Sequence, residues 1–292
     1  MTESLTTLPL PRPQSRDKPL ALNALRTAEY LNAFGWSGVL LSFSHFIKYK
    51  LPGRRSLAPT FAPPEDRIFL RPGTSDLSIF REIFVNRQYD FAEFSVSHLI
   101  KQRYDQLQAR GRRPLIVDAG ANIGLASIFL ARHFPEADFE LIEADEANAA
   151  VARENIAHCK RMRLHNRALW HEHTQLSIFP SDDFSTLRVK ADKASAGAKL
   201  VDTITMADIV GDRSEDLLIV KMDIEGAERE VLSRNNDWLK ANPVIMIEPH
   251  DGVFQAAGSL AGLLAFEPYR EGVILVKGPT LMFAPQGFAG QQ

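Results

Sequence analysis

The sequence predicts an α/β fold in which a mostly parallel sheet is covered by helices on both faces. From Pro114 onwards, short runs rich in β-branched residues alternate with segments of helical periodicity, which is the pattern of consecutive β-α-β units. The end of the chain differs, because Gly272–Lys277 and Thr280–Ala284 are joined by Gly278-Pro279 and should form an antiparallel pair. The chain has 292 residues, 45% of them apolar, so it can bury the core of one large domain with an appendage.

The first part of the chain is expected to lie outside this sheet. Residues 1–18 are polar and proline-bearing, and we expect a flexible arm. Residues 19–68 are expected to form a helical appendage, with helices over about Ala21–Phe34 and Gly38–Lys50. The apolar residues between Phe34 and Ile47 should pack against the main domain; a lid over an apolar substrate, a homo-oligomer surface and membrane contact are the alternatives.

Composition excludes several classes of function. The formal net charge of -2 provides no overall field that would attract nucleic acid or an anionic membrane. A single cysteine, Cys159, excludes an intramolecular disulfide and a cysteine-built zinc site, and it fits a reducing compartment. The N-terminus has no apolar segment typical of a secretory signal, and the richest apolar stretch is too short to cross a bilayer. We therefore expect a cytoplasmic protein without a nucleic-acid partner.

Helices and strands of the main domain follow from the spacing of its apolar residues. Helical spacing runs over Ser75–Phe91 and again over Phe94–Arg110. Buried strands are predicted from five short apolar runs, Leu115–Ala119, Phe139–Glu143, Met162–His165, Leu217–Met222 and Val244–Glu248. Between the third and fourth of these, Gln175–Phe179 and Leu200–Ile204 could form an inserted hairpin or edge strands.

The clearest motif runs from Leu115 to Gly124 with the sequence LIVDAGANIG, a strand followed by a glycine turn that opens a helix. Gly120 would let the backbone turn tightly against a ligand, and Gly124 would let the helix approach the sheet. A dinucleotide-binding turn has the spacing G-x-G-x-x-G, whereas position 122 here is Asn. This spacing argues against NAD and favours a ligand without phosphate groups.

The same turn resembles the first motif of class I methyltransferases, which holds the methionine moiety of S-adenosylmethionine. The resemblance implies that Asp118 meets the amino end of this cofactor and that the turn supplies backbone contacts. The second strand ends at Glu143, whose carboxylate could accept hydrogen bonds from both ribose hydroxyls. The residues assigned to the cofactor are Asp118, Gly120, Ala121, Asn122, Gly124, Glu143, Ala144, Ala168 and Asp223.

A second motif covers the fourth strand and the turn after it. The residues from Lys221 to Leu232, KMDIEGAEREVL, resemble the K-x-D-x-E-G-x-E-x-x-V-L signature of the FkbM family, bacterial methyltransferases of which many act on hydroxyls of sugars and polyketides. The similarity covers roughly residues 70–285. It implies a Rossmann-like domain over residues 69–292 with a seven-stranded sheet, and methyl transfer to a hydroxyl of a sugar or secondary metabolite.

Charged residues follow the fourth and fifth strands, whose carboxyl ends should lie at the same edge of the sheet as the glycine turn. An alcohol attacks a sulfonium methyl group poorly while it keeps its proton, so we expect a base nearby. The candidate catalytic residues are Lys221, Asp223, Glu225, Glu248 and His250.

Two mechanisms remain open for these residues. His250 has the side chain best matched to proton transfer at neutral pH, and a carboxylate could serve instead. Alternatively, Asp223, Glu225 and Glu248 could hold a divalent cation that acidifies the hydroxyl. In a purely structural interpretation, Lys221 forms an ion pair and Glu225 caps the following helix.

Three other functions are weighed against hydroxyl methylation. A module that binds the cofactor without catalysis is disfavoured by the acidic residues, and an NAD-linked oxidoreductase is disfavoured by the glycine spacing. Transfer to nitrogen is disfavoured because Asp223-Ile224-Glu225-Gly226 differs from the Asn/Asp-Pro-Pro-Tyr/Phe tetrad typical of amino-methylating enzymes. In the loop before the fourth strand, polar residues could contact the acceptor or form a plain turn; they are Ser181, Asp183 and Ser185.

Overall fold

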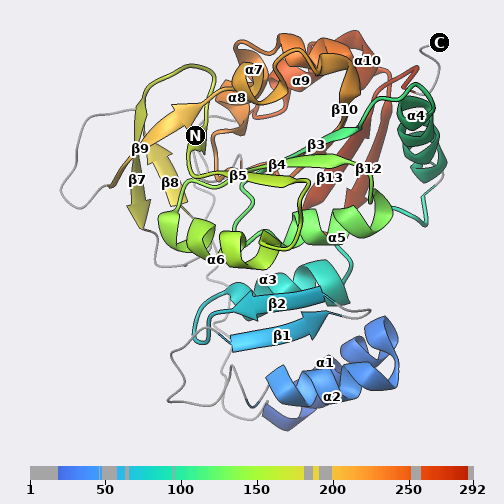
Figure 1. Cartoon of the computed structure of the whole chain (residues 1–292), viewed down its shortest axis with the longest axis vertical. Coiled ribbons are helices and arrows are strands. Elements are labelled where there is room, and N and C mark those ends of the chain that lie inside the picture. The colour runs from blue at the N-terminus through green and yellow to red at the C-terminus, as the bar shows by residue number, and fades with distance from the viewer. Residues whose placement is uncertain are drawn as a thin grey trace, which may run out of the picture.

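A seven-stranded sheet forms the centre of the molecule, with the strand order β12-β13-β11-β10-β3-β4-β5 (Figure 1). Five neighbouring strands are parallel, namely β11 (Val244–Ile247), β10 (Leu217–Met222), β3 (Leu115–Ala119), β4 (Asp138–Ile142) and β5 (Met162–His165). The closing pair β12 (Val273–Lys277) and β13 (Thr280–Ala284) is antiparallel. The predicted Rossmann-like fold is confirmed, and the predicted strands are displaced by at most one residue.

The structure is a computed structural model. It describes residues 19–45, 47, 58–62, 66–94, 96–180, 187–190, 199–250 and 258–288.

Helices cover both faces of the sheet (Figure 1). One face carries α5 (Leu125–His133) and α6 (Glu146–Ile156), and α4 (Ser97–Ala109) contributes to the same core near the β12 edge. The opposite face carries four short helices, α7 (Met206–Val210), α8 (Glu228–Ser233), α9 (Ala261–Leu264) and α10 (Glu267–Arg270), with the 3-10 helices η3 (Ser214–Asp216) and η4 (Asp237–Ala241). Successive side chains of a strand point to opposite faces of the sheet. Ile116 of β3 therefore packs in the core under α5, while Leu115 and Val117 pack in the core on the opposite face.

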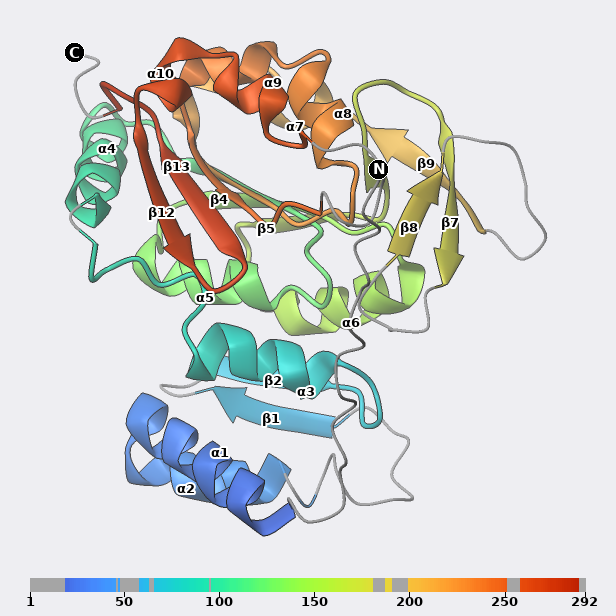
Figure 2. The ribbon, with the colours of Figure 1, turned by 180° about the vertical axis from the view of Figure 1, so that it is seen from behind.

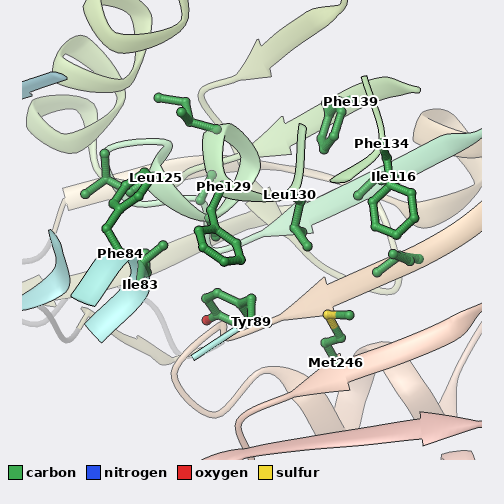
Figure 3. Close-up of a cluster of buried hydrophobic side chains, with 14 of the residues drawn as sticks. Ile83, Phe84, Tyr89, Ile116, Leu125, Phe129, Leu130, Phe134, Phe139 and Met246 are labelled. Atoms are coloured by element: carbon green, nitrogen blue, oxygen red, sulfur yellow. The ribbon is translucent and has the colours of Figure 1, made fainter. Parts of the chain in front are cut away.

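The segment before the first central strand packs on α5 rather than forming one continuous helix. Ser75–Phe91 was predicted as helical, but it divides into α3 (Asp76–Phe80) and the π-helix η2 (Arg81–Val85). Figure 3 shows Phe84 of η2 beside Leu125 and Phe129 of α5, and the rings of Phe84 and Phe129 lie edge to face with centroids 5.8 Å apart. This packing places the residues after Phe80 near the carboxyl edge of the sheet.

The N-terminal appendage contains a hairpin in addition to the expected helices. After α1 (Pro19–Phe34) and α2 (Trp36–His45), the strands β1 (Ala58–Ala62) and β2 (Asp66–Leu70) pair antiparallel. The prediction that residues 19–68 form only helices was therefore incomplete. Two short strands were missed because proline, present at positions 59, 63 and 64, is unfavourable inside strands. The predicted arm over residues 1–18 lies outside the described residues.

Strand β2 ties this appendage to the main domain. The backbone N–H of Phe69 donates to Asn155 Oδ1 of α6 at 2.6 Å, and Asn155 Nδ2 donates back to the Phe69 carbonyl at 3.2 Å. Ile68 and Leu70 are fully buried in the core that α5 covers. The predicted boundary near residue 69 therefore falls inside a strand that belongs to both parts.

The helices α1 and α2 leave part of their apolar surface uncovered. Phe34 and Leu41 pack against the main core, as predicted, whereas Trp36, Leu40 and Phe43 are 82%, 74% and 64% exposed. Among the described residues, no helix combines the length and the apolar character needed to cross a bilayer.

A small second sheet is inserted between β5 and β10, and Figure 2 shows it at the edge of the molecule opposite β12. Its order is β6-β9-β7-β8, with β6 (Ala168–Leu169), β7 (Gln175–Pro180), β8 (Leu187–Lys190) and β9 (Lys199–Ile204). This confirms the predicted insertion. The loop residues Ser181, Asp183 and Ser185, predicted to contact an acceptor, lie outside the described residues.

Candidate active site

The first turn, Gly120–Gly124, follows β3 and packs against the end of the neighbouring strand β10. Gly120 has φ +74°, and a Cβ atom there would lie 1.8 Å from the carbonyl oxygen of Asp223. The close approach of the Asp223 backbone therefore requires a glycine at this position. The predicted contact of Gly120 with a ligand stays a prediction. At Gly124, φ is +82° and a Cβ would lie 3.3 Å from Ile156 and 3.7 Å from Leu141, which confirms its predicted role in helix packing.

Glu143 follows β4 and holds the first turn in place. Its carboxylate accepts the backbone N–H of Asn122 at 2.7 Å and that of Asp145 at 2.8 Å. The side chain lies in a site where only 6% of the residue is exposed. Burial raises the pKa of Glu143 to about 7, although the two N–H donors act in the opposite direction. This carboxylate thus changes its charge in the physiological range.

Asp118 and Lys221 form an ion pair beneath the first turn. Asp118 is fully buried, its Oδ1 lies 3.2 Å from Lys221 Nζ, and its Oδ2 accepts the Ser127 hydroxyl at 2.7 Å. Lys221 also donates to the Gly120 carbonyl at 2.7 Å. Burial opposes the charged ammonium, but the carboxylate of Asp118 raises the pKa of Lys221 overall. The ion pair agrees with the structural interpretation of Lys221, and the contact of Asp118 with the amino end of the cofactor stays a prediction.

The second turn, Asp223–Gly226, follows β10 and requires two residues with positive φ. Gly226 has φ +101°, and Glu225 adopts φ +55°, which is costly for a residue with a side chain. Glu228 is fully buried, and its Oε1 accepts the backbone N–H of Ile224 at 3.1 Å. Helix α8 has no side-chain cap, so the alternative in which Glu225 caps this helix is wrong.

His250 lies against this second turn, three residues beyond the end of β11. Its Nδ1 is 2.9 Å from Glu228 Oε1, while its Nε2 is 3.4 Å from Glu225 Oε2 and 3.8 Å from Asp223 Oδ1. Burial disfavours the charged ring, but the hydrogen bond with Glu228 and the other carboxylates raise the pKa of His250 to about 9. One donor atom from each of Asp223, Glu225 and His250 lies within 4.8 Å of the others, a grouping that could hold a metal ion. Glu248, which the sequence offered as a ligand only in the metal-assisted alternative, is not in this group, whereas His250 is.

Two cavities meet at the first and second turns. The first cavity is lined by both turns together with Glu143, Ala144, Asn148 and Ala168. The second cavity is lined by both turns and by Glu82, Gln88, Tyr89 and Glu248. Four residues line both cavities and are called the shared wall: Gly120, Asn122, Asp223 and Glu225.

The second cavity is rich in carboxylates. Burial and the nearby charge of Asp223 raise the pKa values of Glu82 and Glu248. For Glu225, burial raises the pKa to about 7, with Asp223 adding to the shift and His250 opposing it. Each carboxylate in this cavity disfavours the ionisation of the others. A positively charged group or hydroxyl donors would relieve this repulsion, so the cavity is suited to such a ligand.

The structure separates the predicted cofactor residues by position. Those that line the first cavity are Gly120, Asn122, Glu143, Ala144, Ala168 and Asp223. Ala121 lines the second cavity, whereas Asp118 and Gly124 line neither of the two.

Some residues of the second cavity were not identified from the sequence. Glu82, Gln88 and Tyr89 come from the segment around η2, far before the first central strand. No local motif marks Glu82, because only the packing of η2 on α5 brings it to this edge. Asn148 and Arg167 of the first cavity were missed for a similar reason.

The sequence of this chain is similar to known methyltransferases. Residues 118–268 match the model of the Methyltransferase FkbM domain. Methyltransferase 1 of Beauveria bassiana is 25% identical over 208 residues, which are 62% of this chain and 77% of that protein.

Solved structures with a similar fold include two methyltransferases. One, from Geobacter sulfurreducens, shares 14% identity with a TM-score of 0.35 over 72% of this chain and 86% of its own. The other, a putative caffeoyl-CoA O-methyltransferase from Staphylococcus aureus, shares 12% identity with a TM-score of 0.36 over 73% of this chain and 93% of its own.

Proposed function

This chain belongs to the FkbM methyltransferase family, whose model matches just over half of it, and on that premise we propose that it transfers a methyl group from S-adenosylmethionine to a hydroxyl group of a sugar or another small metabolite. The observation that carries this proposal is the shared wall between the two cavities. A cofactor in the first cavity and an acceptor in the second would meet at Asp223 and Glu225.

The first cavity has the donors and acceptors that S-adenosylmethionine needs. A carboxylate offers about four lone-pair directions, and Glu143 uses two of them for the backbone N–H groups of Asn122 and Asp145. The remaining two can accept the vicinal ribose hydroxyls. Asp223 and Glu225 provide negative charge on the side where a sulfonium centre would lie. These features favour a cationic nucleoside over a dinucleotide with phosphate groups.

The second cavity suits an acceptor that donates hydrogen bonds. Its carboxylates Glu82, Asp223, Glu225 and Glu248 accept from hydroxyls, and they repel anionic acceptors. In the reaction, the acceptor oxygen forms a bond to the methyl carbon as the carbon–sulfur bond breaks. The electron pair of that bond stays on sulfur, and the hydroxyl proton passes to a carboxylate of the cavity.

Transfer of a labelled methyl group tests this proposal. The purified chain is incubated with methyl-labelled S-adenosylmethionine and a set of neutral glycosides, polyols, amino sugars and sugar acids, and the labelled product is then treated with alkali. A methyl ether keeps its label under alkali, whereas a methyl ester loses it as methanol. Label on an amine would indicate nitrogen as the acceptor atom, and cofactor binding without transfer to any hydroxyl would favour a module without catalysis.

A further inference from the structure

We propose that Asp223, Glu225 and His250 form a binding site for a divalent transition-metal ion beside the shared wall. The binding site follows from the positions of the three side chains alone. Only the use of the ion in catalysis, described below, rests on the proposed methyl transfer.

The three donor atoms come from two segments that are distant in the sequence, and they are spaced as ligands of one ion. Asp223 and Glu225 lie in the second turn after β10, and His250 follows β11. The Nε2 atom of His250 is 3.4 Å from Glu225 Oε2 and 3.8 Å from Asp223 Oδ1, and all three donors lie within 4.8 Å. Bonds of about 2.0–2.2 Å to nitrogen and oxygen place ligand atoms on one ion roughly 3–4.4 Å apart. An ion therefore fits with small side-chain adjustments.

Glu228 orients the histidine as an outer-shell carboxylate does in metal sites. Its Oε1 lies 2.9 Å from His250 Nδ1, so that the other ring nitrogen points to Asp223 and Glu225. The same oxygen accepts the backbone N–H of Ile224 and so also fixes the turn that carries Glu225. One buried side chain thus positions two of the proposed ligands.

Charge around the cluster supports an added cation. Glu228 is fully buried, and its Oε2 has no hydrogen-bond partner within the described part of the chain. Lys221, a nearby ammonium, is held mainly by Asp118 and the Gly120 carbonyl, and it lies 3.8 Å from Asp223. The carboxylates raise the pKa of His250, so a divalent ion would bind in exchange for the proton on its Nε2 and would offset the negative charge of this arrangement.

The donor set selects the class of ion. Imidazole nitrogen suits zinc, iron and related ions, whereas sites for magnesium and calcium are built from oxygen alone. One histidine with two carboxylates favours an ion such as Mn²⁺, Fe²⁺ or Zn²⁺. Because only three protein ligands are present, the ion could also bind the hydroxyl oxygen of the acceptor. Binding to the ion would lower the pKa of that hydroxyl. Glu248 lines the second cavity outside the donor set and is then free to receive the proton.

Binding of Mn²⁺ to the metal-free full-length chain tests the site without any acceptor. Free Mn²⁺ is followed by its electron paramagnetic resonance signal during titration, and we expect one bound ion per chain. Asp223→Asn and His250→Gln should each weaken binding by about 100-fold or more. Glu228→Gln keeps all three ligands but should still weaken binding by about 10–100-fold, because it alters the partner of the ligating imidazole.

Glu82→Gln is the matched control, because Glu82 contributes negative charge to the same cavity from outside the donor set. It should change Mn²⁺ affinity by less than about tenfold, since it removes a neighbouring charge but no ligand atom. Circular dichroism of each variant checks that the fold is retained. No Mn²⁺ binding by folded wild-type chain would overturn the inference, as would equal weakening by His250→Gln and Glu82→Gln. Failure of S-adenosylmethionine to bind would instead overturn the proposed function.

Discussion

The two turns of the site reach similar backbone geometry by different means. In the first turn, Gly120, Asn122 and Gly124 adopt positive φ, and the missing side chain of Gly120 makes room for the Asp223 carbonyl. Glycine and asparagine are the residue types that tolerate this conformation best. In the second turn, Glu225 adopts φ +55° although glutamate is not favoured there. The first turn thus uses residues suited to positive φ, whereas the second accepts strain of about 1–3 kcal/mol at Glu225 and gains a charged group in the shared wall.

This difference separates the roles of the turns. Substitutions in the first turn should affect folding and cofactor binding, because its residues fill space and present backbone groups. Substitutions in the second turn should affect turnover, because its side chains face both cavities. The predictions below test this division, beginning with the largest expected effect.

Gly120→Val should abolish cofactor binding and lower the free energy of unfolding by at least about 4 kcal/mol, because its Cβ would overlap the Asp223 carbonyl. Gly111→Ala is the matched control: Gly111 has φ +70°, but a Cβ there meets nothing within 4 Å. The control should cost only about 1–2 kcal/mol. Denaturant unfolding and calorimetry measure both, and similar losses in the two variants would show that the contact with β10 is unimportant.

Asp223→Asn and Glu225→Gln should lower turnover by about 10²–10⁴-fold while cofactor affinity changes much less, because each keeps its shape and loses its charge. Steady-state rates of methyl transfer and calorimetric affinities give the two quantities separately. If turnover and cofactor affinity fell by similar factors, these residues would instead have a role in cofactor binding. Unchanged turnover in both variants would transfer the catalytic role to Glu248 and His250.

Glu143→Ala should weaken cofactor binding by about 1.5–3 kcal/mol, because ribose hydroxyls lose a charged acceptor. Calorimetric titration of the folded variant measures this loss. An unchanged affinity would remove Glu143 from the cofactor site.

Cofactor affinity should also depend on pH through Glu143. Burial raises the pKa of this carboxyl to about 7, so it is neutral below that pH and accepts hydrogen bonds less well. Affinity should therefore fall as the pH is lowered from 8 to 6, by roughly up to tenfold, which corresponds to one pKa unit of differential interaction. The Glu143→Gln variant should lose this dependence, and a wild-type affinity that is flat over this range would contradict the assignment.

Glu225→Gly should be more stable than Glu225→Gln by about 1 kcal/mol, although both lack the carboxylate. Glycine adopts positive φ without steric cost, so the difference between the two variants isolates the backbone strain from the loss of charge. Chemical denaturation of both proteins measures it. Equal stabilities would mean that the second turn stores no strain at Glu225.

Much of the fold could be predicted because the strands and the first turn depend on local sequence. Runs such as Leu115–Ala119 are buried throughout and apolar except for Asp118, and the glycines at positions 120 and 124 mark the turn that follows. The hairpin of β1 and β2 was missed because its prolines resemble breakers. The division of Ser75–Phe91 into α3 and η2 was missed because both parts share helical periodicity.

The site was predicted less completely, because its details depend on contacts between distant segments. The acids after β10 and β11 followed from strand topology, but the burial of Asp118 depends on its pairing with Lys221. The alignment of His250 by Glu228 joins residues 22 positions apart. No spacing rule reveals this pair, since Glu228 occupies the first turn of a helix where an acid is also expected for the helix dipole.

We propose that the first cavity holds S-adenosylmethionine, and calorimetric titration of the wild-type chain measures this binding. We expect one S-adenosylmethionine bound per chain, an affinity weakened in Glu143→Ala, and no heat of binding with NAD. Binding of NAD, or no binding of S-adenosylmethionine by folded protein, would show that the first cavity does not hold this cofactor.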